Sequence, residues 1–219
     1  MRKHTYLAAG FAAGALLTAF SIAPATADTA DELTAGGTNV AVGDSVTANL
    51  ASSNATFSTS IGNIVCTASN FASTVATNPA EDTAEATETV TALAFSGCTS
   101  TVSGTTGVSS IGLTSGTTPT ATVDDDSSAD SAITLDVSPS VTVVLKTVLG
   151  NIKCIYAGAV SGAIDNTAET ITFSGQSVAK QSGSSFACPA SGSFTAAYGP
   201  TVDNNILDAN GNPTALTVN

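Results

Sequence analysis

The chain alternates apolar and polar residues in short segments rather than in helical stripes. Alternation with period two gives a strand one apolar face, and β-branched Thr and Val fit the pleat of a sheet. Runs of helix-forming residues with an apolar stripe are scarce. The sequence therefore predicts strands at residues 45–50, 56–61, 89–95, 132–137, 141–145, 169–173 and 192–198.

Residues that favour turns separate these segments. We expect turns at 62–63, 96–97, 150–151, 199–200 and 210–213. Residues 79–88 and 117–129 lack a clear pattern and are predicted to be exposed loops, the first with at most a helical turn. Many short strands at this spacing indicate an all-β fold, an antiparallel β-sandwich or a barrel-like domain, with almost no helix after residue 27.

The first 27 residues have the pattern of a secretory signal peptide. A basic start, Arg2-Lys3-His4, precedes an apolar stretch over 6–22, and Ala25 and Ala27 provide the small residues of a cleavage site. We expect residues 28–219 to form a single all-β domain without a stable membrane span, located outside the cell or loosely in its envelope.

The mature chain would lack several residue types that carry chemistry. It has no His, Arg, Met or Trp after residue 27, and its only cations are Lys146, Lys153 and Lys180. A Ser-His-Asp site is therefore impossible. With 3 basic and 17 acidic residues, its net charge is 3 − 17 = −14, which disfavours binding to nucleic acid or anionic lipid.

Four cysteines frame an internal repeat. The segment Gly-Asn-Ile-x-Cys ends at Cys66 and again at Cys154, and about 30 residues later each copy reaches a second cysteine, Cys98 or Cys188. Equivalent cysteines in two similar units are expected to pair within their unit, as Cys66–Cys98 and Cys154–Cys188. The sequence thus predicts pseudo-repeat units at about 56–125 and 140–203, each with one disulfide.

The same segments resemble a group of small secreted proteins of actinobacteria. The likeness is carried by 149–156, 171–176, 184–189 and 193–200, with the stretch 57–98 similar to the N-terminal part of that group. The group has no assigned activity, so the resemblance implies an extracellular location but no catalytic or binding residue.

The candidate chemical groups are mainly carboxylates. Paired carboxylates can hydrolyse glycosides, and the candidates here are Asp136, Asp165 and the Asp-rich stretch 124–130. Asp208, Asn210 and Asn212 alternate oxygen ligands as calcium loops do, although an ordinary Asn-Gly-Pro turn explains the same residues. No other metal site and no cofactor is predicted.

These observations favour a secreted, non-enzymatic β protein that acts through its surface on an unknown extracellular or cell-envelope partner. Three alternatives remain open. A membrane-active or pore-forming β protein would need an outward apolar band. A secreted hydrolase inhibitor would need an exposed reactive loop, for which 78–88 and 117–131 are long enough. A carboxylate-based glycoside hydrolase would need two facing acids.

Overall fold

The computed structural model describes residues 31–51, 54–80, 84–124 and 133–219. These residues form strands and turns, and no helix occurs among them. The all-β expectation is therefore confirmed. The strands are β1 Leu33–Ala35, β2 Thr38–Asn39, β3 Ser45–Leu50, β4 Ala55–Thr59, β5 Gly62–Thr77, β6 Ala86–Ser100, β7 Gly107–Leu113, β8 Thr120–Asp124, β9 Thr134–Val137, β10 Ser140–Thr147, β11 Gly150–Ala157, β12 Val160–Asp165, β13 Thr170–Lys180, β14 Ser191–Leu207 and β15 Pro213–Val218.

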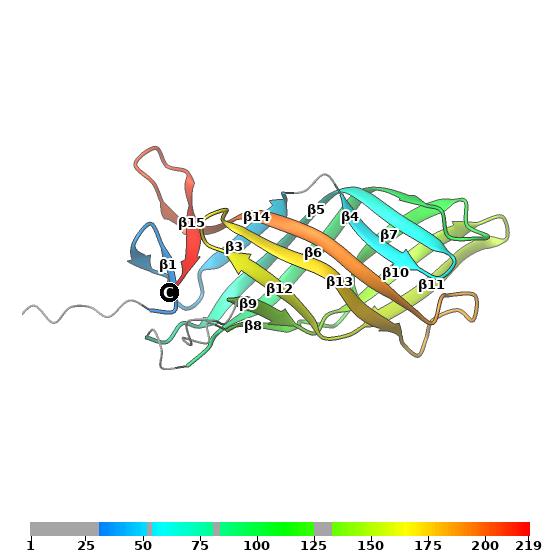
Figure 1. Ribbon diagram of the computed structural model, residues 1–219, viewed down its shortest axis with the longest axis horizontal. Coiled ribbons are helices and arrows are strands. Elements are labelled where there is room, and N and C mark those ends of the chain that lie inside the picture. The colour runs from blue at the N-terminus through cyan, green and yellow to red at the C-terminus, as the bar shows by residue number, and fades with distance from the viewer. Residues whose placement is uncertain (1–30, 52–53, 81–83, 125–132) are drawn as a thin grey trace, which may run out of the picture.

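The strands form one antiparallel sheet that closes on itself. Four long strands, β5, β6, β13 and β14, run most of the length of the elongated molecule (Figure 1). Between them lie four lines of two shorter strands each: β3 with β4, β7 with β8, β9 with β10, and β11 with β12. The ring closes where β14 pairs with β3 and β4, which also pair with β5. The barrel-like alternative is thus the form observed.

Each predicted strand overlaps an observed one, although residues 60–61 and 169 lie in turns, residue 133 precedes β9, and residue 132 lies outside the described part. Two predicted loops are wrong in part. Residues 120–124 form β8, which pairs with β6 and β9. Ala121 and Val123 of this Thr-Ala-Thr-Val segment are buried in the core. The segment is a core strand, although its small and polar residues resemble those of a loop. Likewise Ala86–Glu88 begins β6 rather than ending a loop. Residues 125–132 and 81–83 lie outside the described part.

Several predicted turns lie inside strands. The chain reverses between β4 and β5 at Ser60-Ile61, and Gly62 already belongs to β5. Similarly, Gly150 and Asn151 begin β11. Gly97 lies inside β6 with φ of 60°, and a Cβ atom at this position would overlap the Thr67 hydroxyl. The segment 199–200 lies inside β14, whereas the turn at 210–213 is confirmed between β14 and β15.

The closed sheet holds two groups of buried side chains, one toward each end. The larger group surrounds Tyr198, whose ring contacts Phe71 and Phe173 at centroid distances of 5.4 and 6.2 Å. The Tyr198 hydroxyl lies 2.8 Å from the hydroxyl of Ser69. The smaller group includes Leu145, Tyr156 and both members of the Cys154–Cys188 pair. An eight-stranded ring is just wide enough for such a filled interior.

Strands β1, β2 and β15 cover the end that holds the larger group. Strand β15 pairs with both β14 and β1, and Leu33 and Val218 are buried against the core. The side chain of Asn78 fastens β1 there: its carbonyl accepts from the Leu33 N–H, and its amide donates to the carbonyls of Leu33 and Val40.

Both predicted disulfides are present. Cys66 and Cys98 are register partners on the adjacent strands β5 and β6, whereas Cys154 of β11 is joined to Cys188 in the 181–190 loop. The hairpins β4–β5 and β10–β11 also share a pattern: Thr59 and Thr147 each donate a side-chain bond to the carbonyl of the glycine that follows the turn. The similarity is local, and the two larger repeat units stay a prediction.

In the described ranges, no helix is long and apolar enough to cross a bilayer.

Candidate functional site

The carboxylates proposed for glycoside hydrolysis lie on the surface. Asp136 is exposed on β9, and Asp165 is exposed at the end of β12. A carboxylate oxygen of Asp165 accepts the backbone N–H groups of Thr167 and Ala168, so this side chain organises the turn to β13. Asp125, Asp126 and Asp130 lie outside the described residues.

The calcium candidate forms a hydrogen-bonded turn. One carboxylate oxygen of Asp208 accepts the backbone N–H groups of Asn210 and Asn212, both at 2.8 Å. The other accepts from the side-chain amide of Asn212 at 3.2 Å. These bonds hold the pKa of the exposed Asp208 carboxyl below its usual value. The Asn212 amide nitrogen faces the carboxylate, so this turn is stabilised without a cation; calcium binding there stays untested.

A cavity of about 130 Å³ lies inside the closed sheet. Almost all of its lining is apolar, and the lining residues come from both core groups, including Phe57, Phe71 and Phe194. Tyr156 and Tyr198 also line it, and burial raises the pKa of each hydroxyl to about 12. At neutral pH these hydroxyls therefore stay protonated.

Among the described residues that line this cavity, Glu88 is the one carboxylic acid. It is 3% exposed and accepts a hydrogen bond of 2.5 Å from the Ser73 hydroxyl. Burial raises its pKa, the Ser73 bond opposes the rise, and the nearby Asp203 carboxylate adds to it. The raised pKa favours the protonated form of Glu88, and a protonated carboxyl group, like the two tyrosine hydroxyls, can offer a hydrogen bond.

We expect Glu88→Gln to stabilise the protein at neutral pH. Because the pKa of Glu88 is raised in the folded state, its favourable contribution is complete below the unfolded value near 4.5 and is lost as pH rises toward the folded pKa. The neutral amide avoids that loss, which is about 1.4 kcal/mol for each pKa unit of the rise. Urea unfolding of the variant and of the unaltered protein at pH 4 and pH 7 measures this difference. The variant's increase in the free energy of unfolding should be larger at pH 7. An equal effect at both values would contradict a raised pKa.

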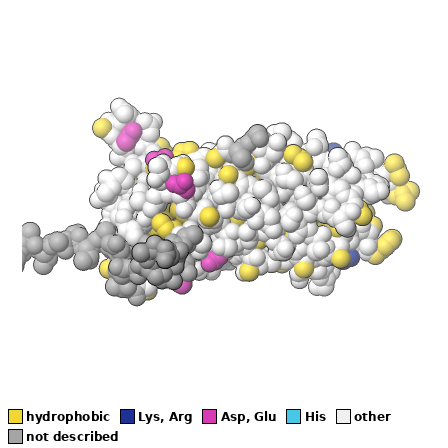
Figure 2. All heavy atoms as spheres, viewed as in Figure 1, with side chains coloured by type: hydrophobic (Ala, Val, Ile, Leu, Met, Phe, Trp, Pro, Cys, Tyr) yellow, Lys and Arg dark blue, Asp and Glu magenta, His cyan; other side chains and the backbone are white. Residues whose placement is uncertain are grey.

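Three connections between strands lie at the end of the molecule opposite β1 and β15 (Figure 1), and each carries exposed apolar side chains. Leu149 and Phe186 are each 96% exposed, Val148 is 85% exposed and Ile61 is 43% exposed. We call these four residues and their turns the apolar end. Figure 2 shows apolar side chains gathered at this tip of the face in view. Isolated exposed apolar residues are ordinary, but a group at one tip indicates a contact surface.

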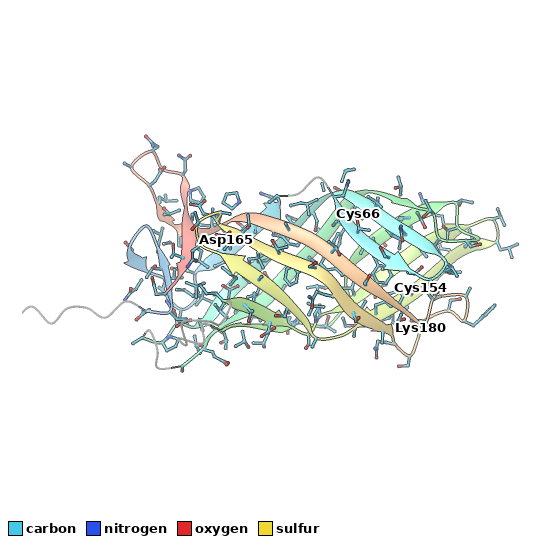
Figure 3. All side chains as sticks on the ribbon, viewed as in Figure 1. Cys66, Cys154, Asp165 and Lys180 are labelled. Atoms are coloured by element: carbon cyan, nitrogen blue, oxygen red, sulfur yellow. A yellow bond between two sulfur atoms is a disulfide. The ribbon has the colours of Figure 1, made fainter. Side chains whose placement is uncertain are left out.

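The three lysines lie just behind these turns. Lys146 precedes the Val148-Leu149 turn in β10, Lys153 follows it in β11, and Lys180 ends β13 at the start of the 181–190 loop. The ammonium group of Lys180 donates to the Cys188 carbonyl at 3.1 Å, while the side chains of Lys146 and Lys153 are exposed. In Figure 3, Lys180 and Cys154 lie toward this end and Asp165 toward the other.

The described carboxylates occupy the opposite half. The sequence has no Asp or Glu in residues 45–80, 89–123, 137–164 or 170–202, and these segments include every strand and turn that reaches the apolar end. Acidic side chains in Figure 2 accordingly appear away from the apolar tip. The charges are therefore unevenly distributed: in the described residues one end of the molecule is cationic and apolar, and the other end is acidic.

Hydrogen bonds between turns hold the apolar end in shape. The Ser103 N–H donates to the Ile61 carbonyl, the Thr106 N–H to the Lys146 carbonyl, and the Ser185 N–H to the Lys153 carbonyl. The Cys154–Cys188 disulfide fixes the loop that carries Phe186. The exposed apolar side chains are thus presented on a fixed framework, which lowers the entropy cost of binding.

Sequence reasoning missed this surface. Two signals were available: Ile61 and Leu149 occupy turn positions before a glycine, where polar residues are usual, and long intervals of the chain lack acids. Neither signal shows that the turns converge at one end, because that depends on how the sheet closes.

Within the described ranges, no group of three or more His, Cys, Asp or Glu side chains is placed to hold a metal ion. Comparison of the chain with family models, curated proteins and solved structures finds no match, so the arrangement of its own residues carries the functional argument.

Proposed function

We propose that this is a secreted, non-enzymatic binding protein that acts at the cell envelope and makes contact through its apolar end. The two disulfides and the all-β fold are compatible with an extracellular protein. The observation that carries the proposal is the placement of Val148, Leu149 and Phe186, which are almost fully exposed on one hydrogen-bonded tip. Keeping such side chains in water has no benefit for folding.

The chemistry of the interior supports a binding role over catalysis. Its one lining carboxyl group has a raised pKa, and its two tyrosines stay protonated. The exposed acids Asp136 and Asp165 lie on the surface, and Asp165 is engaged in its own turn. Turnover of a glycoside, peptide or ester that is lost on changing either acid would contradict the non-enzymatic part of the proposal.

A single introduced tryptophan can report on the contact surface, because the chain contains none. We expect the fluorescence of Leu149→Trp to shift to shorter wavelength when purified cell-envelope material is added, since the indole leaves water. Leu207→Trp is the matched control, because Leu207 is 55% exposed at the acidic end. A shift of the control alone, or of neither reporter at saturating envelope, would contradict contact through the apolar end.

A further inference from the structure

We propose that the partner of the apolar end is the surface of an anionic lipid bilayer, into which the turn side chains insert. This inference rests on the proposed function and deepens it by naming the chemistry of the partner. Three features support this inference: the apolar residues at the tip, the lysines behind them, and the long distance between the described carboxylates and the tip.

The outermost side chains are those that a bilayer accepts. Leu149, Phe186 and Val148 protrude from two separate turns, and Ile61 adds a third. Burying a Leu or Phe side chain contributes roughly 1.5–3 kcal/mol, which corresponds to a factor of ten or more in affinity for each residue. Two such residues are therefore enough to hold a protein at a bilayer reversibly.

The cations lie at the depth that lipid headgroups require. Lys146 in β10 is two residues from Val148, Lys153 in β11 is four residues from Leu149, and Lys180 ends β13 six residues before Phe186. When the turns enter the acyl region, these ammonium groups reach the headgroup layer, because a strand advances about 3.3 Å per residue. Each lysine near an anionic surface improves binding about fivefold.

The carboxylates of the described residues are too distant from the apolar end to oppose this contact. Asp136 is twelve residues from Val148 along the line formed by β9 and β10, or roughly 30 Å after allowance for strand tilt. Salt screens charges over about 8 Å at physiological ionic strength. The expectation from net charge alone, that anionic lipid is disfavoured, therefore does not apply to this end.

The shape of the surface favours a bilayer over a protein partner. A stable protein interface covers about 800 Å² on each side with a continuous, well-packed centre. Here four apolar side chains project from three separate turns with a band of lysines behind them. That order, apolar groups first and cations next, matches the layers of a membrane surface.

The test is co-sedimentation of the secreted protein with vesicles of phosphatidylcholine alone or with 30% phosphatidylglycerol, at low and high salt. We expect binding to the anionic vesicles that weakens with salt. Lys146→Gln with Lys153→Gln should weaken it about 25-fold, while the matched Lys→Arg pair should retain it. Both side chains are exposed, and it is the backbone carbonyls of these lysines that accept the hydrogen bonds from Thr106 and Ser185, so we expect both pairs of variants to fold.

Three outcomes would overturn the inference. Retention on envelope material through the apolar end without binding to either vesicle would mean another partner, and would leave the proposed function standing. Equal binding to both vesicles, unchanged in the Gln pair, would refute the role of the lysines. Self-association that Leu149→Ser abolishes, together with no vesicle binding, would assign the end to a second copy of the chain.

Discussion

Removal of either disulfide is expected to lower the free energy of unfolding by about 3–4 kcal/mol. The cysteines are separated by 32 and 34 residues, and closing loops of this length stabilises the folded state by that amount in the chain-entropy model. Total stabilities are typically about 5–15 kcal/mol, so one cross-link is a large share. Urea unfolding of Cys66→Ala with Cys98→Ala, and of Cys154→Ala with Cys188→Ala, measures both effects.

The two disulfides should differ in their effect on binding. Cys66 and Cys98 join strands that remain paired along their length, so their removal should leave the apolar end intact in the folded protein. Cys154–Cys188 anchors the 181–190 loop, which carries Phe186. Its removal should therefore also reduce retention on the envelope. Unchanged stability in both double variants would contradict this account of the disulfides.

The strands were predictable because their alternation is local. The segments 45–50, 141–145 and 192–198 each bury one face as the pattern indicates, and the cysteine repeat identified both disulfides. The strand β8 was not predictable, because Thr120, Ala121 and Thr122 are compatible with a loop until β6 and β9 provide partners.

The closure of the sheet was beyond the sequence pattern. The pairing of β14 with β3 and β4 joins segments about 150 residues apart, and no local signal distinguishes a closed sheet from two packed layers. Strands β1 and β15 cover one end, and Asn78, between β5 and β6, helps to hold β1 there by its bonds to Leu33 and Val40. The sequence around Asn78 does not indicate these partners.

The candidate site illustrates the same limit in its charges. The sequence shows three lysines and a net charge of −14 for the expected mature chain, and this sum argues against an anionic partner. Closure of the sheet places Lys146, Lys153 and Lys180 at one end and the described carboxylates at the other. The distribution of charge, which only the fold determines, reverses the expectation for the surface at that end.

Leu149→Ser combined with Phe186→Ser is expected to reduce retention on cell-envelope material about 100-fold, since each side chain contributes a factor of ten or more. Both residues are 96% exposed, so their replacement should change stability by no more than about 0.5 kcal/mol. The matched control is Val42→Ser with Leu207→Ser, which removes two exposed apolar side chains from the acidic end.

Contact through the apolar end is tested most directly by a binding isotherm of the purified protein on envelope material, measured in parallel for these two double variants. Contact through the apolar end predicts that Leu149→Ser with Phe186→Ser loses affinity while Val42→Ser with Leu207→Ser binds like the unaltered protein. Equal affinity of all three proteins, or loss only in the control pair, would contradict the account.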